Sequence, residues 1–335
     1  MTITPIRLSL PSKGRLESAT LQFLAEAGLE VLKPNPRQYQ ATIPMLPHLQ
    51  VIFQRPGDIV VSVRQGSVDF GITGMDVIAE KRGENGEVIL LHDNLGFGHC
   101  ALTLAVPESW TDVRNMNDLS EKVRSLGRPL RVATKFPNLT QQFLEKYAIP
   151  HFLINAEGTL ETAPTIGYAD VISDLVSSGQ TLKDNRLKPL EDGVILYSQA
   201  ALIANRKALE ESQAALEMGR LLLEYAEAHL RAKENLLVIA NMRGESPQEI
   251  TQKMFTQKYI AGLQGPTISP VYVYEKGQKW FSVTIVVRRD HLTESINELR
   301  AIGGSGIIVT PVTYIFEEEP PRYLAMCATL MKRDN

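Results

Sequence analysis

The sequence predicts an α/β protein with two lobes, followed by a smaller domain with the element order βαββαβ. Over the first two hundred residues, short apolar runs alternate with amphipathic stretches of helical length. This alternation is typical of a parallel or mixed sheet covered by helices on both faces. The last hundred residues instead place two strand and helix pairs around a hairpin, which is the ferredoxin-like arrangement.

Strands and helices are predicted in alternation over the first 155 residues. Ile6–Leu10 is an apolar run that predicts a strand, and Leu16–Ala27 is an amphipathic stretch that predicts a helix ending before Gly28. Two further stretches predict helices over Asp58–Gln65 and Leu139–Tyr147. Six further apolar runs predict strands over Leu49–Gln54, Val68–Ile72, Glu87–Leu91, Cys100–Val106, Leu130–Ala133 and His151–Asn155.

A second block of elements begins after Gly98, and the apolar stretches within Gly193–Asn205 are expected to return to the first block. The sequence therefore predicts a first lobe from residues 1–98 and 187–206, and a second lobe from residues 99–186, with a cleft between them. Residues 206–235 carry a leucine-rich stripe with charged residues opposite. This pattern predicts one long helix, whose part over 207–235 connects the lobes to the last domain.

The last domain is expected over residues 236–317. Apolar runs predict strands over Leu236–Asn241, Thr267–Tyr274, Lys279–Val287 and Ile307–Phe316, and helices are predicted over Pro247–Tyr259 and Asp290–Ile302. Ser246 is placed to cap the first of these helices. Residues 318–335 are expected to form a loosely held tail.

Composition excludes several functional classes. The 335 residues carry a net charge of −3, with 22% charged and 44% hydrophobic residues, so neither disorder nor a basic nucleic-acid-binding protein is expected. Two cysteines and no signal-like N-terminal segment predict a cytoplasmic protein. No apolar run is long enough for a membrane span. The histidines show no zinc spacing and no nucleophilic triad stands out.

A turn of small residues near residue 180 is the most informative motif. Ser177, Ser178, Gly179 and Thr181 follow an apolar strand, and such a turn can bind a phosphate through backbone N–H groups and hydroxyls. Asp170 and Asp174 precede the turn, where carboxylates can accept bonds from sugar hydroxyls or hold Mg²⁺. By pattern alone, an ordinary helix cap is an equally good interpretation.

Cations follow three predicted strands. Lys13 and Arg15 come after the first strand, Arg55 after another, and Lys135 after a third. Because ligands of open α/β sheets bind at the carboxyl ends of strands, these side chains are candidates for contacting an anionic substrate. Glu157, Gly158, Thr159 and Glu161 also follow a strand, although a helix cap explains that segment equally simply.

Several spaced motifs together resemble the ATP phosphoribosyltransferase family in its long form, over nearly the whole chain. The resemblance is carried by KGRL from Lys13, VDFGITG from Val68, LGFGHC from Leu95 and RVATKFP from Arg131. The most specific match places Glu161 ahead of GYAD at 167–170 and SGQTL at 178–182. GPTISP from Gly265 extends the match into the last domain.

The resemblance implies a reaction and roles for the candidate residues. N1 of ATP would displace pyrophosphate from phosphoribosyl pyrophosphate, with no covalent nucleophile, as the first step of histidine biosynthesis. Mg²⁺ would bind through the substrate phosphates, with Asp170 and Asp174 as candidate ligands. The implied contacts are the 5-phosphate for Ser177, Ser178, Gly179 and Thr181, the ribose hydroxyls for Asp170 and Asp174, and the ribose and pyrophosphate for Glu157, Gly158, Thr159 and Glu161. Lys13, Arg15, Arg55 and Lys135 would meet ATP or pyrophosphate.

The resemblance also implies a fold and a regulator. The two lobes would resemble periplasmic binding proteins, and the last domain would bind histidine as a feedback inhibitor through Thr267, Val286 and Gly306. Long-form members form dimers and hexamers of one chain. Two alternatives stay open at this point: a solute-binding regulator built on the same two lobes, and a phosphoribosyltransferase that acts on another base.

Overall fold

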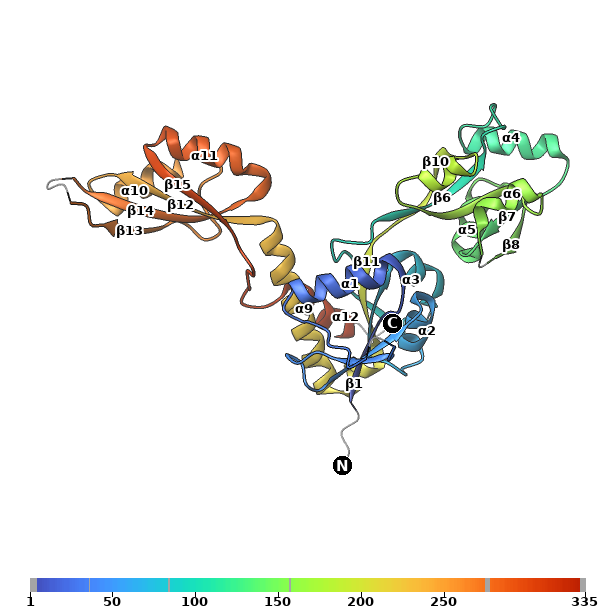
Figure 1. The fold of residues 1–335 in the computed structure, drawn as a ribbon, viewed down its shortest axis with the longest axis horizontal. Coiled ribbons are helices and arrows are strands. Elements are labelled where there is room, and N and C mark those ends of the chain that lie inside the picture. Colours follow the sequence, from blue (N-terminus) through green and yellow to red (C-terminus); the bar gives the residue numbers. More distant parts are fainter. Residues whose placement is uncertain (1–4, 36, 84, 157, 275–277, 332–335) are drawn as a thin grey trace. The chain divides into compact units, whose positions relative to one another are not determined.

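The computed structural model describes residues 5–35, 37–83, 85–156, 158–274 and 278–331. The chain divides into two compact units: one holds the residues up to Leu223 together with those from Pro321 onward, and the other is Glu224–Pro320. The first unit contains two separate sheets and the second unit contains one (Figure 1). The α/β class predicted from the sequence is confirmed.

The first lobe is built on a six-stranded sheet with the order β2-β3-β1-β4-β11-β5. Its strands are β1 (Ile6–Pro11), β2 (Gln40–Thr42), β3 (Leu49–Gln54), β4 (Phe70–Gly74), β5 (Val88–His92) and β11 (Ala200–Asn205). Its helices include α1 (Gly14–Glu26), α2 (Pro56–Arg64), α3 (Met75–Lys81) and α8 (Arg206–Glu211). β1 pairs in parallel with both β3 and β4, so the ends of these three strands share one edge.

β11 returns to this sheet from far along the chain. It runs antiparallel between β4 and β5, and all six of its residues are buried. A strand that is covered on both faces and paired on both sides favours apolar residues, which is why residues 200–204 fit this place. The polar side chain at its end, Asn205, is satisfied by donating to the Val63 carbonyl and accepting the Ala208 N–H.

The second lobe is built on a five-stranded sheet with the order β10-β6-β9-β7-β8. Its strands are β6 (Cys100–Pro107), β7 (Leu130–Thr134), β8 (His151–Asn155), β9 (Val171–Val176) and β10 (Leu187–Ser198). Its helical segments are α4 (Met116–Leu126), α5 (Pro137–Lys146), a 3-10 turn (Leu160–Thr162), α6 (Ala163–Ile166) and α7 (Gln180–Asp184). β7 pairs in parallel with β8 and β9, so α5 and the turn after β9 leave the same edge.

The returning segment begins later than the sequence suggests. β10 pairs with β6 in the second sheet, and only β11 joins the first. The chain therefore re-enters the first lobe after Ser198 rather than at residue 187. Both stretches are apolar, and the sequence contains no signal for which sheet each one pairs with.

The expected long helix over 206–235 is two helices. α8 ends at Glu211, and α9 runs over Gln213–Lys233. Ser212 interrupts them with extended backbone angles of φ −126° and ψ 107°. Its hydroxyl accepts a bond from the N–H of Ala215 at 3.2 Å, and serine favours such a cap over a helix interior.

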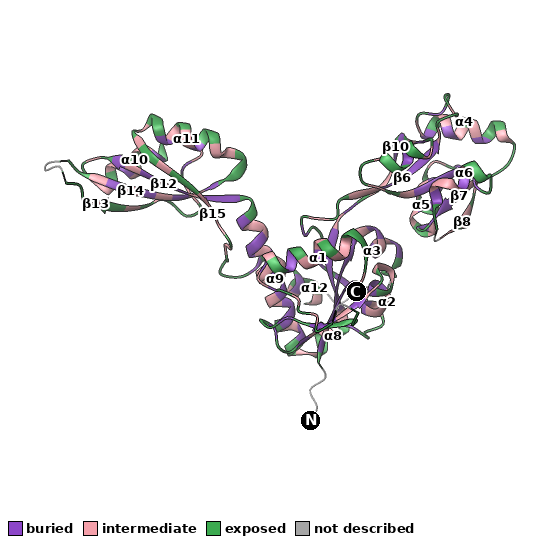
Figure 2. Cartoon of the chain, viewed as in Figure 1, coloured by how far each residue is buried: buried purple, intermediate pink, exposed green. Residues whose placement is uncertain are grey.

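The second unit confirms the ferredoxin-like prediction. Its four-stranded antiparallel sheet has the order β13-β14-β12-β15. The elements are β12 (Asn235–Arg243), α10 (Pro247–Phe255), β13 (Thr267–Val271), β14 (Trp280–Arg288), a 3-10 turn (Arg289–His291), α11 (Leu292–Ala301) and β15 (Gly304–Pro311). Alternate residues of β12 and β14 are buried, and they pack in one apolar cluster with Ile250 of α10 and Leu299 of α11. Figure 2 colours the chain by burial.

The tail is not the loosely held extension that the sequence suggested. Residues Pro321–Met331 form a helix, α12, which belongs to the first unit and contacts β5 and α8. Met326 is buried against that lobe, with only 2% of its surface exposed. An amphipathic tail becomes an ordered helix when a lobe offers its apolar face a place to pack.

Among the described residues, no helix combines the length and the apolar character that a membrane span needs.

Candidate active site

The turn between β9 and α7 forms a small polar hollow. The hollow has a volume of about 60 Å³ and is lined by Glu161, the segment from Asp174 to Gly179, Thr181 and Leu182. Gly179 has φ +75°, a left-handed conformation that glycine adopts without strain. This bend turns the chain from the strand into α7 and leaves the turn open to solvent.

The backbone of this turn offers unused hydrogen-bond donors. Within the described part of the chain, the N–H groups of Ser177, Ser178 and Gly179 have no protein acceptor. Among the described residues, the one bond to a hydroxyl of the turn is long, from the Gln180 N–H to Ser178 Oγ at 3.4 Å. Successive N–H groups around a glycine bend make a concave site suited to an anion. The structure thus brings Ser177, Ser178, Gly179 and Thr181 together in one hollow, as the sequence predicts.

Two acids, Asp174 and Glu161, line this hollow, and the charge of Lys135 acts on Asp174. Burial raises the pKa of Asp174, while the N–H of Leu175 and the charge of Lys135 act in the opposite direction and Glu161 adds to the increase. The Leu175 N–H donates to Asp174 Oδ1 at 2.8 Å. A partly desolvated carboxylate beside a second acid is a strong acceptor for hydroxyl groups or for a cation that arrives with a ligand.

Asp170 lies at the opposite end of β9 from this hollow. Its N–H donates to the carbonyl of Arg131 at the start of β7, whereas Asp174 lies near the carboxyl end. Four residues of strand separate the two acids by roughly 13 Å, which is too far for both to bind one ribose. The pairing of Asp170 with Asp174 at a single site is therefore not what the fold produces.

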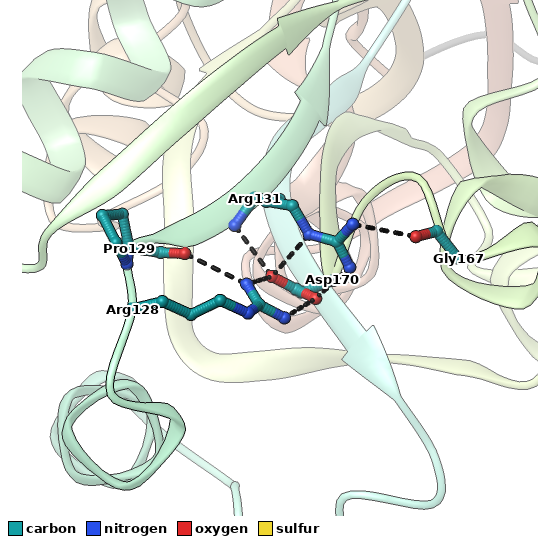
Figure 3. A network of polar contacts seen from close by, with 5 residues as sticks. All are labelled: Arg128, Pro129, Arg131, Gly167 and Asp170. Atoms are coloured by element: carbon teal, nitrogen blue, oxygen red, sulfur yellow. Dashed lines mark hydrogen bonds and ion pairs between the residues drawn. The ribbon is translucent and has the colours of Figure 1, made fainter.

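Two arginines that the sequence analysis did not single out hold Asp170 (Figure 3). Arg128 donates from Nη1 and Nη2 at 2.7 and 2.8 Å, and Arg131 donates from its backbone N at 2.9 Å and from Nη2 at 2.8 Å. Burial by itself would raise the pKa of Asp170, but these hydrogen bonds hold it well below its usual range. The acid is fully engaged in joining β7 to β9. In the sequence, the only signal for this ion pairing with Asp170 is the presence of two arginines, Arg128 and Arg131, on either side of Leu130.

The cations of the first lobe gather at one edge of its sheet. Lys13 and Arg15 follow β1, and Arg55 follows β3, which is the parallel neighbour of β1. All three side chains are exposed. Lys135 is the exception, because it follows β7 in the second lobe and acts on Asp174. The structure therefore divides the predicted cations between two lobes.

The segment before the 3-10 turn is described only in part. Glu157 lies outside the described residues. Gly158 and Thr159 are exposed, and a side chain added at Gly158 would meet nothing within 4 Å. Of this segment, only Glu161 lines the hollow beside Asp174.

A larger hollow of about 1220 Å³ lies elsewhere on the first lobe, lined by Ile6, Leu49, Met218 and others along β1, β2, β3 and α9. Ile6 and Leu49 begin their strands, so this hollow is at the opposite edge from Lys13 and Arg55. It is largely apolar and lies away from the polar groups that could bind phosphates.

The three candidate inhibitor residues are spread over the last domain. Thr267 begins β13, Val286 is in β14 and Gly306 is in β15 with φ +58°. β13 and β15 are the two edges of the sheet, so about 14 Å separates the outer two residues at the usual strand spacing. One chain does not bring them around a single small ligand.

Comparison with known proteins decides the family. The ATP phosphoribosyltransferase family profile matches residues 55–224, and the profile "HisG, C-terminal domain" matches residues 232–314. The chain belongs to the ATP phosphoribosyltransferase family. "ATP phosphoribosyltransferase 2, chloroplastic" of Arabidopsis thaliana is 46% identical over 332 residues, which span 97% of this chain and 80% of that protein.

A bacterial relative agrees over the same length. "ATP phosphoribosyltransferase" of Bradyrhizobium sp. (strain ORS 278) is 33% identical over 97% of this chain and 98% of its own. Among solved structures, a chain of the ATP phosphoribosyltransferase (HisG:HisZ) complex from Thermotoga maritima superposes with a TM-score of 0.50. That match has 24% identity over 66% of this chain and 96% of the other, and it supports the fold.

The family establishes the reaction. An ATP phosphoribosyltransferase transfers the phosphoribosyl group of phosphoribosyl pyrophosphate to N1 of ATP and releases pyrophosphate, which is the first step of histidine biosynthesis. This finding rules out the solute-binding regulator and the transferase for another base as the function of the chain.

Proposed function

We propose that the turn after β9 binds the 5-phosphate of phosphoribosyl pyrophosphate and so holds the donor substrate for the transfer. The observation that supports it is the row of N–H groups at Ser177, Ser178 and Gly179, around a left-handed glycine, that have no acceptor in the described part of the chain. Three successive donors are equal in number to the three terminal oxygens of a phosphate monoester. The hydroxyls of Ser177, Ser178 and Thr181 add donors of the same kind.

In this proposal Asp174 and Glu161 face the ribose and the pyrophosphate. The transition state carries positive charge on the ribose ring and negative charge on the departing pyrophosphate. A carboxylate of raised pKa beside the ring stabilises the positive charge and accepts bonds from the hydroxyls. Asp170 is not part of the proposed site, because Arg128 and Arg131 already occupy both of its oxygens. Gly158 and Thr159 remain candidates beside Glu161.

The cationic edge of the first lobe completes the proposed site. Lys13, Arg15 and Arg55 would bind the triphosphate of ATP, and Lys135 would meet pyrophosphate beside Asp174. No step needs a covalent nucleophile: binding both substrates in line and stabilising the separating charges supplies the rate enhancement.

Magnesium enters this proposal bound to substrate. Among the described residues, no three acidic, histidine or cysteine side chains group into a metal site. Mg²⁺ commonly takes one or two carboxylates and completes its shell with substrate phosphates and water. In the proposal Asp174 would supply one such ligand. The ion would neutralise charge on the leaving pyrophosphate.

The proposal extends to regulation and assembly. Thr267, Val286 and Gly306 would contribute to a histidine site on the last domain. Because the two edge strands separate Thr267 from Gly306, a second copy of the chain has to complete that site, which agrees with a homo-oligomer, as a dimer or hexamer. The proposed location is the compartment that holds the histidine pathway, with the cytoplasm as the first expectation.

One assay tests the reaction. The protein is mixed with ATP, phosphoribosyl pyrophosphate and Mg²⁺, with pyrophosphatase to remove product, and the near-ultraviolet absorbance of the N1-substituted adenine is followed. Product formation that stops when Mg²⁺ is chelated supports the proposal. No absorbance change from the folded protein contradicts it. Histidine added over the micromolar to millimolar range tests feedback inhibition, and unchanged rates would exclude it.

A further inference from the structure

Helix α5 of the second lobe has no cap of its own. Phe136 occupies its N-cap position, and its side chain makes no capping hydrogen bond. Pro137 follows in the first turn and has no N–H. The N–H groups of Asn138 and Leu139 are therefore left to find an acceptor elsewhere, at the end of the helix where the dipole favours negative charge.

Glu80 of the first lobe supplies that acceptor. Its Oε1 accepts the Asn138 N–H at 2.9 Å, and its Oε2 accepts the Leu139 N–H at 3.0 Å. The Asn138 side chain also donates to the Glu80 carbonyl at 3.2 Å. Glu80 is 8% exposed, so both carboxylate oxygens are removed from most of the solvent by this contact.

A second buried acid of α3 makes a similar contact one turn earlier. The Ser198 hydroxyl donates to Asp76 Oδ1 at 2.6 Å and accepts the Asp76 N–H at 3.0 Å. Asp76 and Ser198 are 4% and 2% exposed. Ser198 ends β10 of the second sheet. Since Asp76 and Glu80 are four residues apart in a helix, they share one face, and this face of α3 is bonded to the second lobe at two points.

These contacts lie between the two halves of the proposed site. α3 follows β4, which neighbours β1, and β1 leads into Lys13. α5 follows β7, which neighbours β9, and β9 leads into the phosphate turn. The chain itself passes between the lobes only after β5 and after β10. A rotation about these two crossings would separate Glu80 from α5 and leave its carboxylate and two amides without their present partners. The cost falls mainly on the Glu80 carboxylate, because that side chain is buried, whereas Asn138 is exposed and Leu139 is half-buried.

We propose that Glu80, assisted by Asp76, is a positioning residue that sets the orientation of the phosphate turn relative to the cations of the first lobe. This inference rests on the proposed function, because it assigns the two substrates to different lobes. The alternative is that the Glu80 carboxylate occupies a place at α5 that a substrate anion takes during turnover. The two interpretations predict opposite effects of removing the carboxylate: a lower kcat for a positioning residue, and tighter binding of the anion for a carboxylate that occupies its place.

The test compares Glu80→Ala with Glu80→Gln and with Glu121→Ala, an exposed glutamate of α4. Hydrogen exchange of the peptide that contains Asn138 and Leu139 reports the contact directly. Direct titration of phosphoribosyl pyrophosphate reports binding at the turn. We expect faster exchange at both amides in Glu80→Ala, a dissociation constant close to that of the unaltered protein, and kcat lower by on the order of 10- to 100-fold.

Glu80→Gln keeps the length of the side chain and one acceptor oxygen, so it should recover part of kcat. Glu121→Ala should leave exchange, binding and kcat unchanged. A purely structural role would lower stability without separating kcat from binding. If the unaltered protein makes product and Glu80→Ala keeps the full kcat, the inference is overturned. Tighter binding of pyrophosphate to Glu80→Ala would also overturn it, in favour of the substrate-anion alternative. An inactive unaltered protein would instead contradict the proposed function.

Discussion

Arg322 Nη2 lies 2.7 Å from Asp93 Oδ1 and joins the tail helix α12 to the segment that leaves β5 for the second lobe. The Asp93 carbonyl also accepts a bond from Gln199 Nε2 at 2.9 Å, where the chain returns from that lobe. The helix is therefore attached beside both passages between the lobes. The Arg322 and Asp93 side chains are 37% and 52% exposed, so the pair itself contributes no more than about 1 kcal/mol.

Burial of Met326 should stabilise the tail more than the ion pair does. We expect Met326→Ala to lower the free energy of unfolding of the catalytic unit by about 2–5 kcal/mol, and Arg322→Ala to lower it by less than about 1 kcal/mol. Urea titrations followed by circular dichroism measure both. Equal effects of the two substitutions would show that charge, rather than apolar contact, holds α12 in place.

His92 should make this lobe sensitive to acid. Burial, with a smaller contribution from Arg322, lowers the pKa of His92 to about 4 from 6.5, and its Nδ1 accepts the Asn94 N–H at 3.2 Å. As the pH falls through 6.5, the unfolded chain takes up a proton that the folded chain refuses until near pH 4. The free energy of unfolding therefore decreases over this window, by at most about 1.4 kcal/mol for each pH unit.

His92→Asn is the matched variant for this prediction, since its Oδ1 can accept the same N–H without titrating. Unfolding measured at pH 7 and pH 5 should show a smaller difference in stability for His92→Asn than for the unaltered protein. The same loss of stability in both proteins would assign the acid sensitivity to other groups.

Gly179→Val should disable the phosphate turn without unfolding the protein. A Cβ at Gly179 would have its nearest neighbour, Val176 Cγ1, at 4.0 Å, so the damage comes from the backbone angle of +75° and not from a clash. We expect kcat/KM for phosphoribosyl pyrophosphate to fall by about 100-fold or more, because the N–H donors turn away from the phosphate.

Gly127→Val is the control for this prediction. Gly127 ends α4 with φ +65° and has nothing within 4 Å of an added Cβ. It therefore carries a comparable backbone strain away from the hollow. Similar losses of activity in the two variants would mean that general strain, and not the turn, accounts for the effect.

Asp170→Asn and Asp174→Asn should separate stability from catalysis. Asp170→Asn removes a charge that Arg128 and Arg131 both bind, and we expect the free energy of unfolding to fall by about 1–3 kcal/mol. Because the pKa of Asp170 is depressed, its contribution is present at neutral pH and is lost as the pH falls below about 4.

Asp174→Asn should act in the opposite way. Burial already disfavours its charge, so we expect little change in stability and a large loss of kcat. Thermal unfolding and steady-state kinetics on the two variants check both statements. Loss of activity in Asp170→Asn at unchanged stability would instead show that Asp170 belongs to the active site.

Local patterns in the chain determined much of this protein. Apolar alternation in β12 and β14 and the small-residue turn at 177–181 depend on neighbours in sequence, and both were predicted. The hollow at Gly179 and the ferredoxin-like order follow from such local rules, because the backbone conformation of a short segment is set mainly by its own residues.

Pairing between distant residues was decided only by the tertiary structure. Asp170 and Asp174 look alike in the sequence, yet strand direction places one against two arginines and the other at the hollow. Phe136 leaves α5 uncapped in its own segment, and Glu80 caps it from the other lobe. Met326 converts an apparent tail into a packed helix. Each outcome depends on which surfaces pack together in the folded chain. Burial and the need of unpaired donors for an acceptor determine the partner, and the neighbours in sequence do not specify it.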